Sequence, residues 1–466
     1  MIWDLKKYGE RAAILDEHGT ALTYAALAQE GQRVAEAAGR RCLTFLLCRN
    51  ETGAIIGYTG LLNAGIVPLL LSSQTDGEAL AALLEAYRPA YLWAPEDLPD
   101  TTPVFQAFGY RLLKTRFQDD PPLHPDLALL LTTSGSTGSP KFVRQSYGNI
   151  RANAESIASY LELSGEERPI TTLPMNYTYG LSVINSHLLT GGTLLVTEKS
   201  LMQREFWDFF KQAGATSLSG VPYTYEMLDR MRFHRMDLPT LRTMTQAGGK
   251  LSPALHRKFA EEARASDRRF VVMYGQCEAT ARMGYLPPEK AVEKCGSMGI
   301  AIPGGSFRLL DGEDRPITAP GVTGELIYEG PNVAMGYAER KEDLSRGDEW
   351  GGVLRTGDMA KFDEDGYYYI TGRKKRFLKI YGNRVNLDEV DGLLREKFPG
   401  LDCASTGVDD RLYVFVTDGT QTEAVKAFLV RRTHLNPAAF RVKAIGEIPK
   451  NDAGKTLYRE LEAYCT

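Results

Sequence analysis

The sequence predicts an α/β protein with a large N-terminal domain of several subdomains, containing sheets of parallel type and a small β-rich part, followed by a smaller α+β domain. Short apolar segments alternate with amphipathic ones along the first two thirds of the chain, as in βα units. Glycine-rich strand patterns begin near Gly324. A basic run at 373–376 precedes a last stretch with its own helix and strand patterns, so we expect an N-terminal domain over 1–373 and a C-terminal domain over 374–466.

The individual elements follow from apolar runs and from residues that end helices. The segment 81–87 has the apolar spacing of a helix that ends before Pro89, and the apolar run 90–94 is typical of a strand. The same alternation predicts strands at 127–131, 192–197 and 216–220 and helices at 149–161 and 205–212. Further on, it predicts strands at 324–329, 366–371 and 411–416 and a helix at 388–397.

Composition and charge exclude several classes of protein. The chain has 466 residues, of which 43% are hydrophobic and 24% charged, as is typical of soluble globular proteins. Its net charge of −4 gives no overall basic field, so neither nucleic acid nor an anionic membrane is an expected partner. The six cysteines form no Cys-x-x-Cys pair, which indicates reduced thiols. There is no signal-peptide pattern and no apolar run near the ~20 residues of a membrane helix, so we expect a cytoplasmic protein without membrane insertion.

The most informative motif is the segment 132–141, Thr-Thr-Ser-Gly-Ser-Thr-Gly-Ser-Pro-Lys, directly after the predicted strand 127–131. Small residues let the backbone wrap tightly around an anion, hydroxyl groups can donate to phosphate oxygens, and Lys141 adds a positive charge. The alternative is a polar surface turn, but the density of the pattern and its place after a strand favour a polyphosphate site. It is not a Walker loop, because Gly138 is followed by Ser139 rather than by lysine.

This motif resembles the signature of the adenylate-forming superfamily, which includes acyl-CoA synthetases, nonribosomal adenylation domains and luciferases. Chance rarely produces six such motifs in the expected order. The further segments similar to family motifs are Tyr-Gly-Gln-Cys-Glu at 274–278, the blocks 324–326 and 330–337, Leu-Arg-Thr-Gly-Asp at 354–358, Gly-Arg at 372–373 and Pro-Lys-Asn-Asp-Ala-Gly-Lys at 449–455.

The resemblance implies an AMP-forming acid:thiol ligase that uses ATP and Mg²⁺. In the first step, a small carboxylic acid attacks the α-phosphate of ATP, forming an acyl-adenylate and releasing pyrophosphate. In the second step, the phosphopantetheine thiol of CoA, or of an acyl or peptidyl carrier protein, takes the acyl group.

The resemblance also assigns a nucleotide site. Tyr274 is expected to stack on adenine and Asp358 to accept the ribose hydroxyls, while Thr133 and Glu278 hold Mg²⁺. The expected nucleotide-binding residues are Thr133, Ser134, Gly135, Ser136, Thr137, Gly138, Lys141, Gly248, Tyr274, Cys277, Asp358 and Arg373.

Three lysines of the C-terminal domain have expected roles in the two-step reaction. By resemblance, Lys455 acts with Glu278 in catalysis and stabilises the charge that develops during adenylation. Lys379 enters the site, together with Gly382, only for thioester formation. Lys375 is the hinge about which the mobile C-terminal domain turns.

The block 173–183 resembles the segment that lines the acyl site. Tyr177 is expected to be the gate between acyl site and thiol tunnel, with Tyr179 and Tyr223 as aromatic walls, although all three also fit a plain core. Amino-acid activators place an aspartate here to pair the substrate ammonium, and Thr178 stands in that place, so an ordinary carboxylic acid is favoured. Arg282 could meet a polar substrate group, and an equally good interpretation is a surface ion pair.

Two other functions stay open at this point. One is a stand-alone amino-acid adenylating enzyme that loads a carrier protein. The other is a degenerate, non-catalytic nucleotide- or acyl-binding protein, because Cys277 replaces a family threonine and Phe142 a family glycine. The presence of Glu278, Asp358 and the other catalytic groups argues against degeneration.

Overall fold

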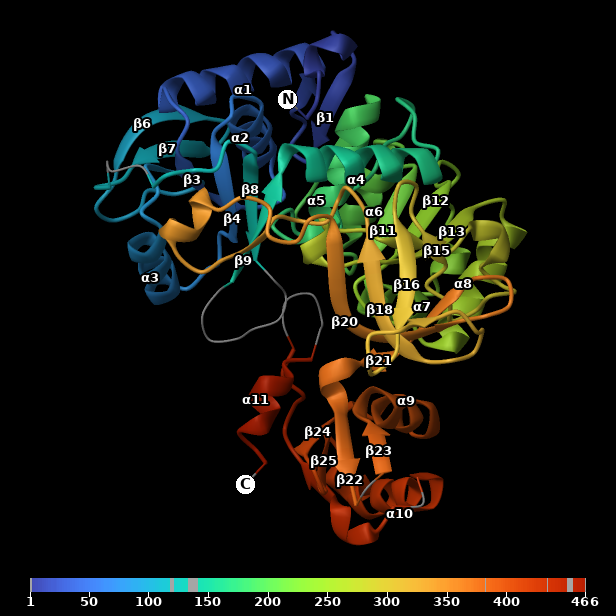
Figure 1. Ribbon diagram of the computed structural model, residues 1–466. Helices are drawn as coiled ribbons and strands as arrows, with labels where there is room; N and C mark the ends of the chain where they lie inside the picture. The colour runs from blue at the N-terminus through green and yellow to red at the C-terminus, as the bar shows by residue number, and fades with distance from the viewer. Residues whose placement is uncertain are drawn as a thin grey trace. The chain divides into compact units, whose positions relative to one another are not determined.

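The computed structural model describes residues 2–117, 121–132, 141–381, 383–433, 435–450 and 456–465, and these form two compact units (Figure 1). The described residues of the first unit fall within 1–133, 139–306 and 328–354, and those of the second within 307–327 and 355–466. Both units combine sheets with helices, which confirms the predicted α/β class. The expected domain boundary after residue 373 stays a prediction.

The largest sheet of the first unit has eight strands in the order β19-β9-β8-β4-β3-β5-β7-β6. Its strands are β3 (Leu43–Cys48), β4 (Val67–Ser72), β5 (Tyr91–Ala94), β6 (Thr102–Ala107), β7 (Tyr110–Lys114), β8 (Leu127–Thr132), β9 (Phe142–Ser146) and β19 (Gly336–Ala338). The central strands β8, β4, β3 and β5 run parallel, and the outer strands pair antiparallel. The parallel strands are buried along almost their whole length, as expected for a sheet covered on both faces.

Helices α1 (Tyr24–Ala38) and α2 (Thr52–Asn63) meet through two glycines. A Cβ atom on Gly60 would lie 2.3 Å from the carbonyl oxygen of Gly31, so the two backbones approach too closely for any side chain there. Helix α3 (Gly77–Tyr87) begins at Asp76, whose carboxylate accepts hydrogen bonds from two backbone N–H groups of the first turn.

The second large sheet of the first unit has the order β11-β12-β13-β14-β15. Its strands are β11 (Ser217–Gly220), β12 (Thr243–Gln246), β13 (Arg269–Tyr274), β14 (Gly284–Tyr285) and β15 (Ile300–Ala301), of which the first three are parallel. The helices of this part are α4 (Tyr147–Tyr160), α5 (Thr178–Thr190), α6 (Arg204–Gln212), α7 (Pro222–Arg230) and α8 (Pro253–Ala265). A small sheet of β10 (Leu194–Val196), β1 (Ala12–Asp16) and β2 (Ala21–Thr23) completes the unit.

The second unit contains most of a five-stranded sheet and a set of smaller elements at the C-terminal end of the chain. The sheet has the order β17-β16-β18-β20-β21, with β16 (Ser306–Leu310), β17 (Pro316–Ile317), β18 (Gly324–Glu329), β20 (Val353–Phe362) and β21 (Tyr368–Arg373). After it come the hairpin of β22 (Phe377–Ile380) and β23 (Asn383–Asn386), the sheet of β24 (Cys403–Val408), β25 (Arg411–Val416) and β26 (Phe440–Ala444), and the helices α9 (Leu387–Lys397), α10 (Thr422–Thr433) and α11 (Tyr458–Glu462).

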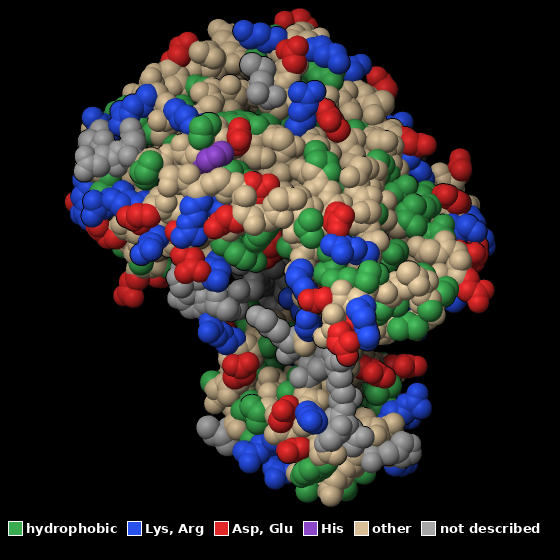
Figure 2. Space-filling model, viewed as in Figure 1, with side chains coloured by type: hydrophobic (Ala, Val, Ile, Leu, Met, Phe, Trp, Pro, Cys, Tyr) green, Lys and Arg blue, Asp and Glu red, His purple; other side chains and the backbone are tan. Residues whose placement is uncertain are grey.

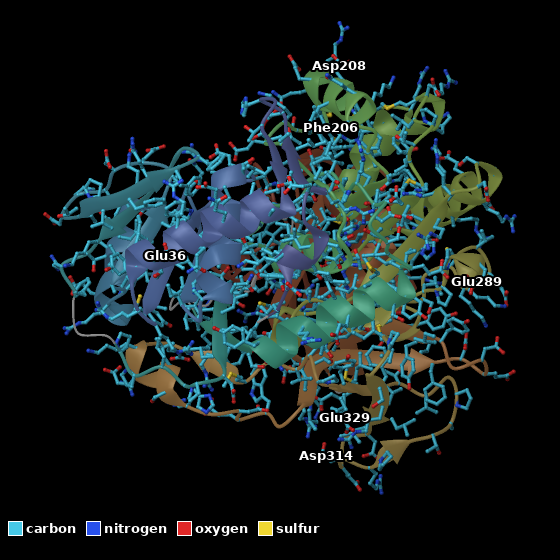
Figure 3. All side chains as sticks on the ribbon, turned by 90° about the horizontal axis from the view of Figure 1, so that it is seen from above. Glu36, Phe206, Asp208, Glu289, Asp314 and Glu329 are labelled. Atoms are coloured by element: carbon cyan, nitrogen blue, oxygen red, sulfur yellow. The ribbon has the colours of Figure 1, made fainter. Side chains whose placement is uncertain are left out.

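The surface follows the sequence pattern. On α6, Phe206 and Phe210 are buried and Asp208 is exposed, and Figure 3 shows Phe206 nearer the core than Asp208. Figure 2 shows basic and acidic side chains interspersed on the visible face, in keeping with the small net charge. Within the described ranges, no helix combines the length and apolar character that crossing a membrane requires.

Candidate functional site

The loop after β13 is held in a strained conformation. Two residues without the freedom of glycine, Thr280 and Ala281, have φ values of 57° and 119°. Such conformations cost about 1–3 kcal/mol each and persist only when surrounding contacts enforce them. Gly275 makes the turn possible, because a Cβ atom there would lie 1.6 Å from the carbonyl oxygen of Ala281. The loop therefore presents Glu278 and Arg282 in fixed positions.

The carboxylate of Glu278 accepts a hydrogen bond from Tyr337, 59 residues further along the chain. The hydroxyl of Tyr337 donates to Oε1 of Glu278 over 2.8 Å, and burial followed by the charge of Glu278 raises the pKa of Tyr337. The ammonium of Lys141 lies 5.3 Å from the centroid of the Tyr337 ring and 3.0 Å from Oε1 of Glu339. A hollow of about 670 Å³ opens here, lined by Lys141, Tyr337, Glu339, Arg340, Asp343, Arg346, Glu349 and Trp350.

Cys277 connects this loop to both strands that flank the predicted phosphate loop. Its thiol donates to the carbonyl oxygen of Thr132, the last residue of β8, over 3.5 Å. Its own carbonyl accepts a hydrogen bond of 3.3 Å from the side chain of Gln145 on β9. The phosphate-loop residues Thr133, Ser134, Gly135, Ser136, Thr137 and Gly138, together with Gly382 and Lys455, lie outside the described residues.

The predicted acyl-site tyrosines belong to a mixed aromatic and aliphatic cluster. The rings of Tyr177 and Tyr179 lie 6.4 Å apart, and the hydroxyl of Tyr179 shares a 2.7 Å hydrogen bond with Oγ1 of Thr245. Gly248 has a φ of +85°, and a Cβ atom there would lie 2.6 Å from the Tyr177 hydroxyl oxygen. Glycine at this position thus makes room for Tyr177. Their neighbours in the cluster are Ile157, Tyr160, Leu161, Leu163, Leu173, Val183, Val221, Ala247, Val271, Met273 and Tyr285.

The structure separates Tyr223 from this cluster. Helix α7 exposes 58% of Tyr223, whereas Tyr225, two residues on, is fully buried and donates its hydroxyl to the carbonyl of Thr245. Residues two apart lie on different faces of a helix, so only one of the two tyrosines can face the sheet. Thr178 is the first residue of α5 and is partly exposed.

The surface ion pair considered for Arg282 is wrong. Its side chain is only 2% exposed, and its neighbours are the Ser182 hydroxyl, the Tyr160 hydroxyl and the Met273 sulfur. Nothing in the sequence indicated this burial, because charged side chains are almost always exposed.

In the second unit, the structure brings together the two residues expected at the ribose. Asp358 and Arg373 are partners across β20 and β21, and Nε of Arg373 lies 3.2 Å from Oδ1 of the buried Asp358. The backbone N–H of Arg373 donates to Asp388 over 2.8 Å. Glu325 holds the next residue, Lys374, through an ion pair of 2.8 Å.

The expected hinge and its surroundings form a polar network. Lys375 lies in the short turn Lys374–Arg376, and its side chain is outside the described part. Arg376 pairs with the buried Asp391 over 2.7 Å, and Asp391 also accepts the hydroxyl of Tyr458. Lys379 is exposed on β22, where its N–H donates to Asp409.

A family model described as AMP-binding enzyme matches residues 2–338. The chain belongs to the AMP-binding enzyme family. This confirms the resemblance to the adenylate-forming superfamily that the sequence motifs indicated.

Several CoA ligases are relatives of this AMP-binding enzyme. Indoleacetate–CoA ligase of Aromatoleum aromaticum is 33% identical over 284 residues, which cover 59% of this chain and 54% of that protein, so the chain matches about half the length of that relative. Sulfoacetate–CoA ligase of Cupriavidus necator is 31% identical over 405 residues, or 83% of this chain and 76% of that protein. Feruloyl-CoA synthase of an Amycolatopsis species is 28% identical over 362 residues, covering 74% and 72%.

Solved structures show the same fold. O-succinylbenzoate CoA synthetase of Bacillus subtilis, in complex with its acyl-adenylate, superposes with a TM-score of 0.80 at 21% identity, over 98% of this chain and 96% of that one. The ATP-bound MatB of Rhodopseudomonas palustris gives a TM-score of 0.78 at 23% identity, over 99% and 98%. At such identities the likeness concerns the fold of this AMP-binding enzyme.

Proposed function

We propose that this AMP-binding enzyme is an ATP-dependent acid–CoA ligase. The carboxylate of its substrate attacks the α-phosphate of ATP, pyrophosphate leaves, and the thiol of CoA then displaces AMP from the acyl-adenylate. The relatives named above support this activity, since they are CoA ligases. They favour CoA over a carrier protein as the acyl acceptor, and they favour neither an amino-acid adenylating enzyme nor a degenerate binding protein.

The observation that carries the proposal is the attachment of the Glu278 loop to both strands around the phosphate loop. Cys277 contacts Thr132, the last residue of β8, and Gln145 on β9, so its neighbour Glu278 is held against these two strands. A carboxylate in that place can meet a Mg²⁺ ion that also contacts ATP. Attack of one anion on another requires charge neutralisation, which such an arrangement supplies.

The donor set fits Mg²⁺. This ion takes one or two carboxylates and completes its shell with phosphate oxygens and water. Among the described residues no group of three or more His, Cys, Asp or Glu side chains could hold a metal, and the partly exposed Glu278 uses one oxygen for Tyr337. Glu278, with Thr133 as the second expected ligand, would hold the ion, which would draw negative charge from the α-phosphate when bound.

The remaining roles belong to the same proposal. Tyr274 stacks on adenine, Asp358 accepts the ribose hydroxyls and Arg373 contacts ribose or phosphate. Lys455 supplies positive charge in adenylation, and Lys379 serves thioester formation. The small domain turns about Lys375 between the two steps. We place the enzyme in the cytoplasm.

The same proposal covers the other nucleotide contacts. Lys141 and the phosphate-loop residues before it hold the phosphates. Gly248 and Cys277 border the nucleotide. Gly248 also leaves room for Tyr177 at the acyl side, and Cys277 fixes the loop of Glu278.

In the acyl site, Tyr177 is the gate towards the thiol tunnel and Tyr179 supplies an aromatic wall. Thr178 offers no charge to an ammonium, so the substrate is a carboxylic acid without an α-amino group.

The test combines pyrophosphate exchange, AMP formation and mass-spectrometric detection of the CoA thioester over a panel of acids. Wild-type protein should exchange pyrophosphate with a non-amino acid and produce its CoA thioester. Glu278→Gln should lose exchange by roughly 10²-fold or more, and the exposed Glu155→Gln on α4 should match wild type. Faster exchange with any proteinogenic amino acid would establish the amino-acid adenylating alternative, and ATP binding without exchange for any acid would establish the non-catalytic one.

A further inference from the structure

Among its described residues, the first unit buries two arginine side chains, Arg144 and Arg282, which differ in their partners. Arg144 pairs with Glu349 and donates to the backbone carbonyls of Met335 and Tyr337. Arg282 is equally buried, but within the described ranges no aspartate or glutamate forms an ion pair with it. A buried charge without a counter-charge is strongly destabilising. Burial of the Arg282 guanidinium therefore destabilises the fold, whereas Glu349 compensates the burial of the Arg144 guanidinium.

The neighbours of Arg282 are neutral and leave one side of its guanidinium available. Nε donates to the Ser182 hydroxyl and Nη1 to the Tyr160 hydroxyl, each over 3.1 Å. The guanidinium lies 5.1 Å from the centroid of the Tyr179 ring. In the part of the chain that the structure describes, Nη2 has no hydrogen-bond partner. These contacts orient the group but do not neutralise it.

Two buried asparagine side chains fix the backbone of Arg282. Its carbonyl oxygen accepts hydrogen bonds from the side-chain amides of Asn153, over 2.8 Å, and Asn332, over 3.1 Å. The two preceding residues, Thr280 and Ala281, carry the positive φ values. Strain and buried amides spent on one position are typical of groups that must be preorganised for a ligand.

Arg282 also lies beside the proposed acyl site. Its guanidinium faces the ring of Tyr179, which lies 6.4 Å from the ring of the proposed gate Tyr177. Tyr160 and Tyr285 stack on each other with centroids 4.3 Å apart, and Tyr160, Tyr177 and Tyr285 are all partly exposed. Arg282 thus places a positive charge against the aromatic side chains of the proposed acyl site.

We propose that Arg282 binds a second oxyanion on the substrate, so that the enzyme activates acids which carry a remote carboxylate or sulfonate besides the reacting carboxylate. This inference rests on the proposed function and narrows its substrate class. The remote oxyanion accepts a charge-assisted hydrogen bond from Nη2 and supplies the missing counter-charge. The reacting carboxylate remains free to attack ATP.

The decisive experiment compares acids that differ only in the remote group. Dicarboxylic acids from malonic to adipic acid are each paired with their monoamide, and sulfoacetic and 3-sulfopropionic acids test the sulfonate. Binding of the free acids is measured by calorimetry, and turnover by AMP release with ATP and CoA. At the best length, the diacid should bind about 10- to 100-fold more tightly than its monoamide, and the sulfo acid than the monoamide of the same chain length. The kcat/KM values should follow.

Two variants and a control connect the preference to Arg282. Arg282→Met should abolish the preference for the charged acid while leaving the KM for ATP unchanged, and Arg282→Lys should retain part of it. Arg151→Met, which removes an exposed arginine paired with Glu155 on α4, should behave as wild type. If Arg282→Met does not fold, wild type and Arg282→Lys still decide the question.

The outcomes distinguish the inference from the function on which it rests. Monoamides that bind as well as the corresponding diacids and sulfo acids would overturn the role of Arg282 even if the enzyme forms CoA thioesters. Selective binding of a charged acid that Arg282→Met abolishes would support the inference even if no turnover follows, and in that case the ligase proposal alone would fail. An equal loss of binding for charged and neutral acids in Arg282→Met would show a structural role only.

Discussion

The hydrogen bond between Tyr337 and Glu278 makes the proposed metal ligand testable. Tyr337→Phe removes only the hydroxyl that donates to Glu278 over 2.8 Å, and it keeps the ring that packs against Trp350 and faces Lys141. A hydrogen bond to a charged group contributes about 1.5–3 kcal/mol, and the partial exposure of Glu278 points to the lower end. Since 1.4 kcal/mol corresponds to a factor of ten, adenylation should fall about tenfold.

The assay is pyrophosphate exchange measured over a range of Mg²⁺ concentrations. If Tyr337 positions Glu278 for the ion, the loss in Tyr337→Phe should shrink as Mg²⁺ rises, while the melting temperature stays close to that of wild type. Tyr369→Phe is the matched control, because it removes a hydroxyl that donates to Asp363 over 3.0 Å in the second unit. A loss that does not depend on Mg²⁺, or an equal loss in Tyr369→Phe, would refute the reasoning.

Three further predictions concern other groups. Cys277→Thr should keep adenylation or raise its kcat/KM by up to about tenfold, because a hydroxyl is the stronger donor; loss of exchange in a folded variant would show a role for the thiol itself. Lys455→Ala should slow acyl-adenylate formation by roughly 10²–10³-fold but spare thioester formation from supplied acyl-adenylate. Lys375→Pro should instead slow thioester formation and leave pyrophosphate exchange largely intact. Equal losses of both steps in each variant would contradict a turning domain. Burial, with the nearby charge of Arg282, lowers the pKa of His187 from 6.5 to about 4. The contribution of neutral His187 to the free energy of unfolding is therefore complete above pH 6.5. It decreases by about 1.4 kcal/mol for each pH unit as the pH falls from 6.5 towards 4. In unfolding measured as a function of pH, His187→Gln should flatten this slope.

The surroundings of the phosphate loop were predictable because their signals are local. The apolar run that forms β8 and the amphipathic pattern of α4 follow directly from short stretches of sequence, and the structure contains both. Helix α5 was not predicted, since its residues from Tyr179 to Leu188 are all buried and leave no polar face to give a helical period. A helix that is covered on all sides resembles any other apolar segment in sequence.

The surroundings of the proposed acyl site were less predictable, because side-chain direction and burial depend on distant residues. Tyr223 and Tyr225 have the same residue type and nearly the same position, and only the docking of α7 decides that Tyr225 is buried. For Arg282 the usual exposure of charged side chains pointed to the surface. Its neighbours Ser182 and Tyr160 lie 100 and 122 residues away in sequence, so no local pattern records the contact.

The strained loop accounts for how one short segment would serve both proposed sites, the metal site at Glu278 and the oxyanion site at Arg282. Glu278 meets Tyr337 on the side of the phosphate-loop strands, and Arg282 meets Tyr179 on the acyl side, although only three residues separate them. A regular helix would place residues four apart on the same face. The positive φ values at Thr280 and Ala281 break that pattern, and Asn332 offsets their cost by accepting the Thr280 hydroxyl and donating to the carbonyl of Arg282. Because adenylation requires a carboxylate to reach the α-phosphate, a loop that fixes both side chains would, under the two proposals, also set the distance between the two reactants.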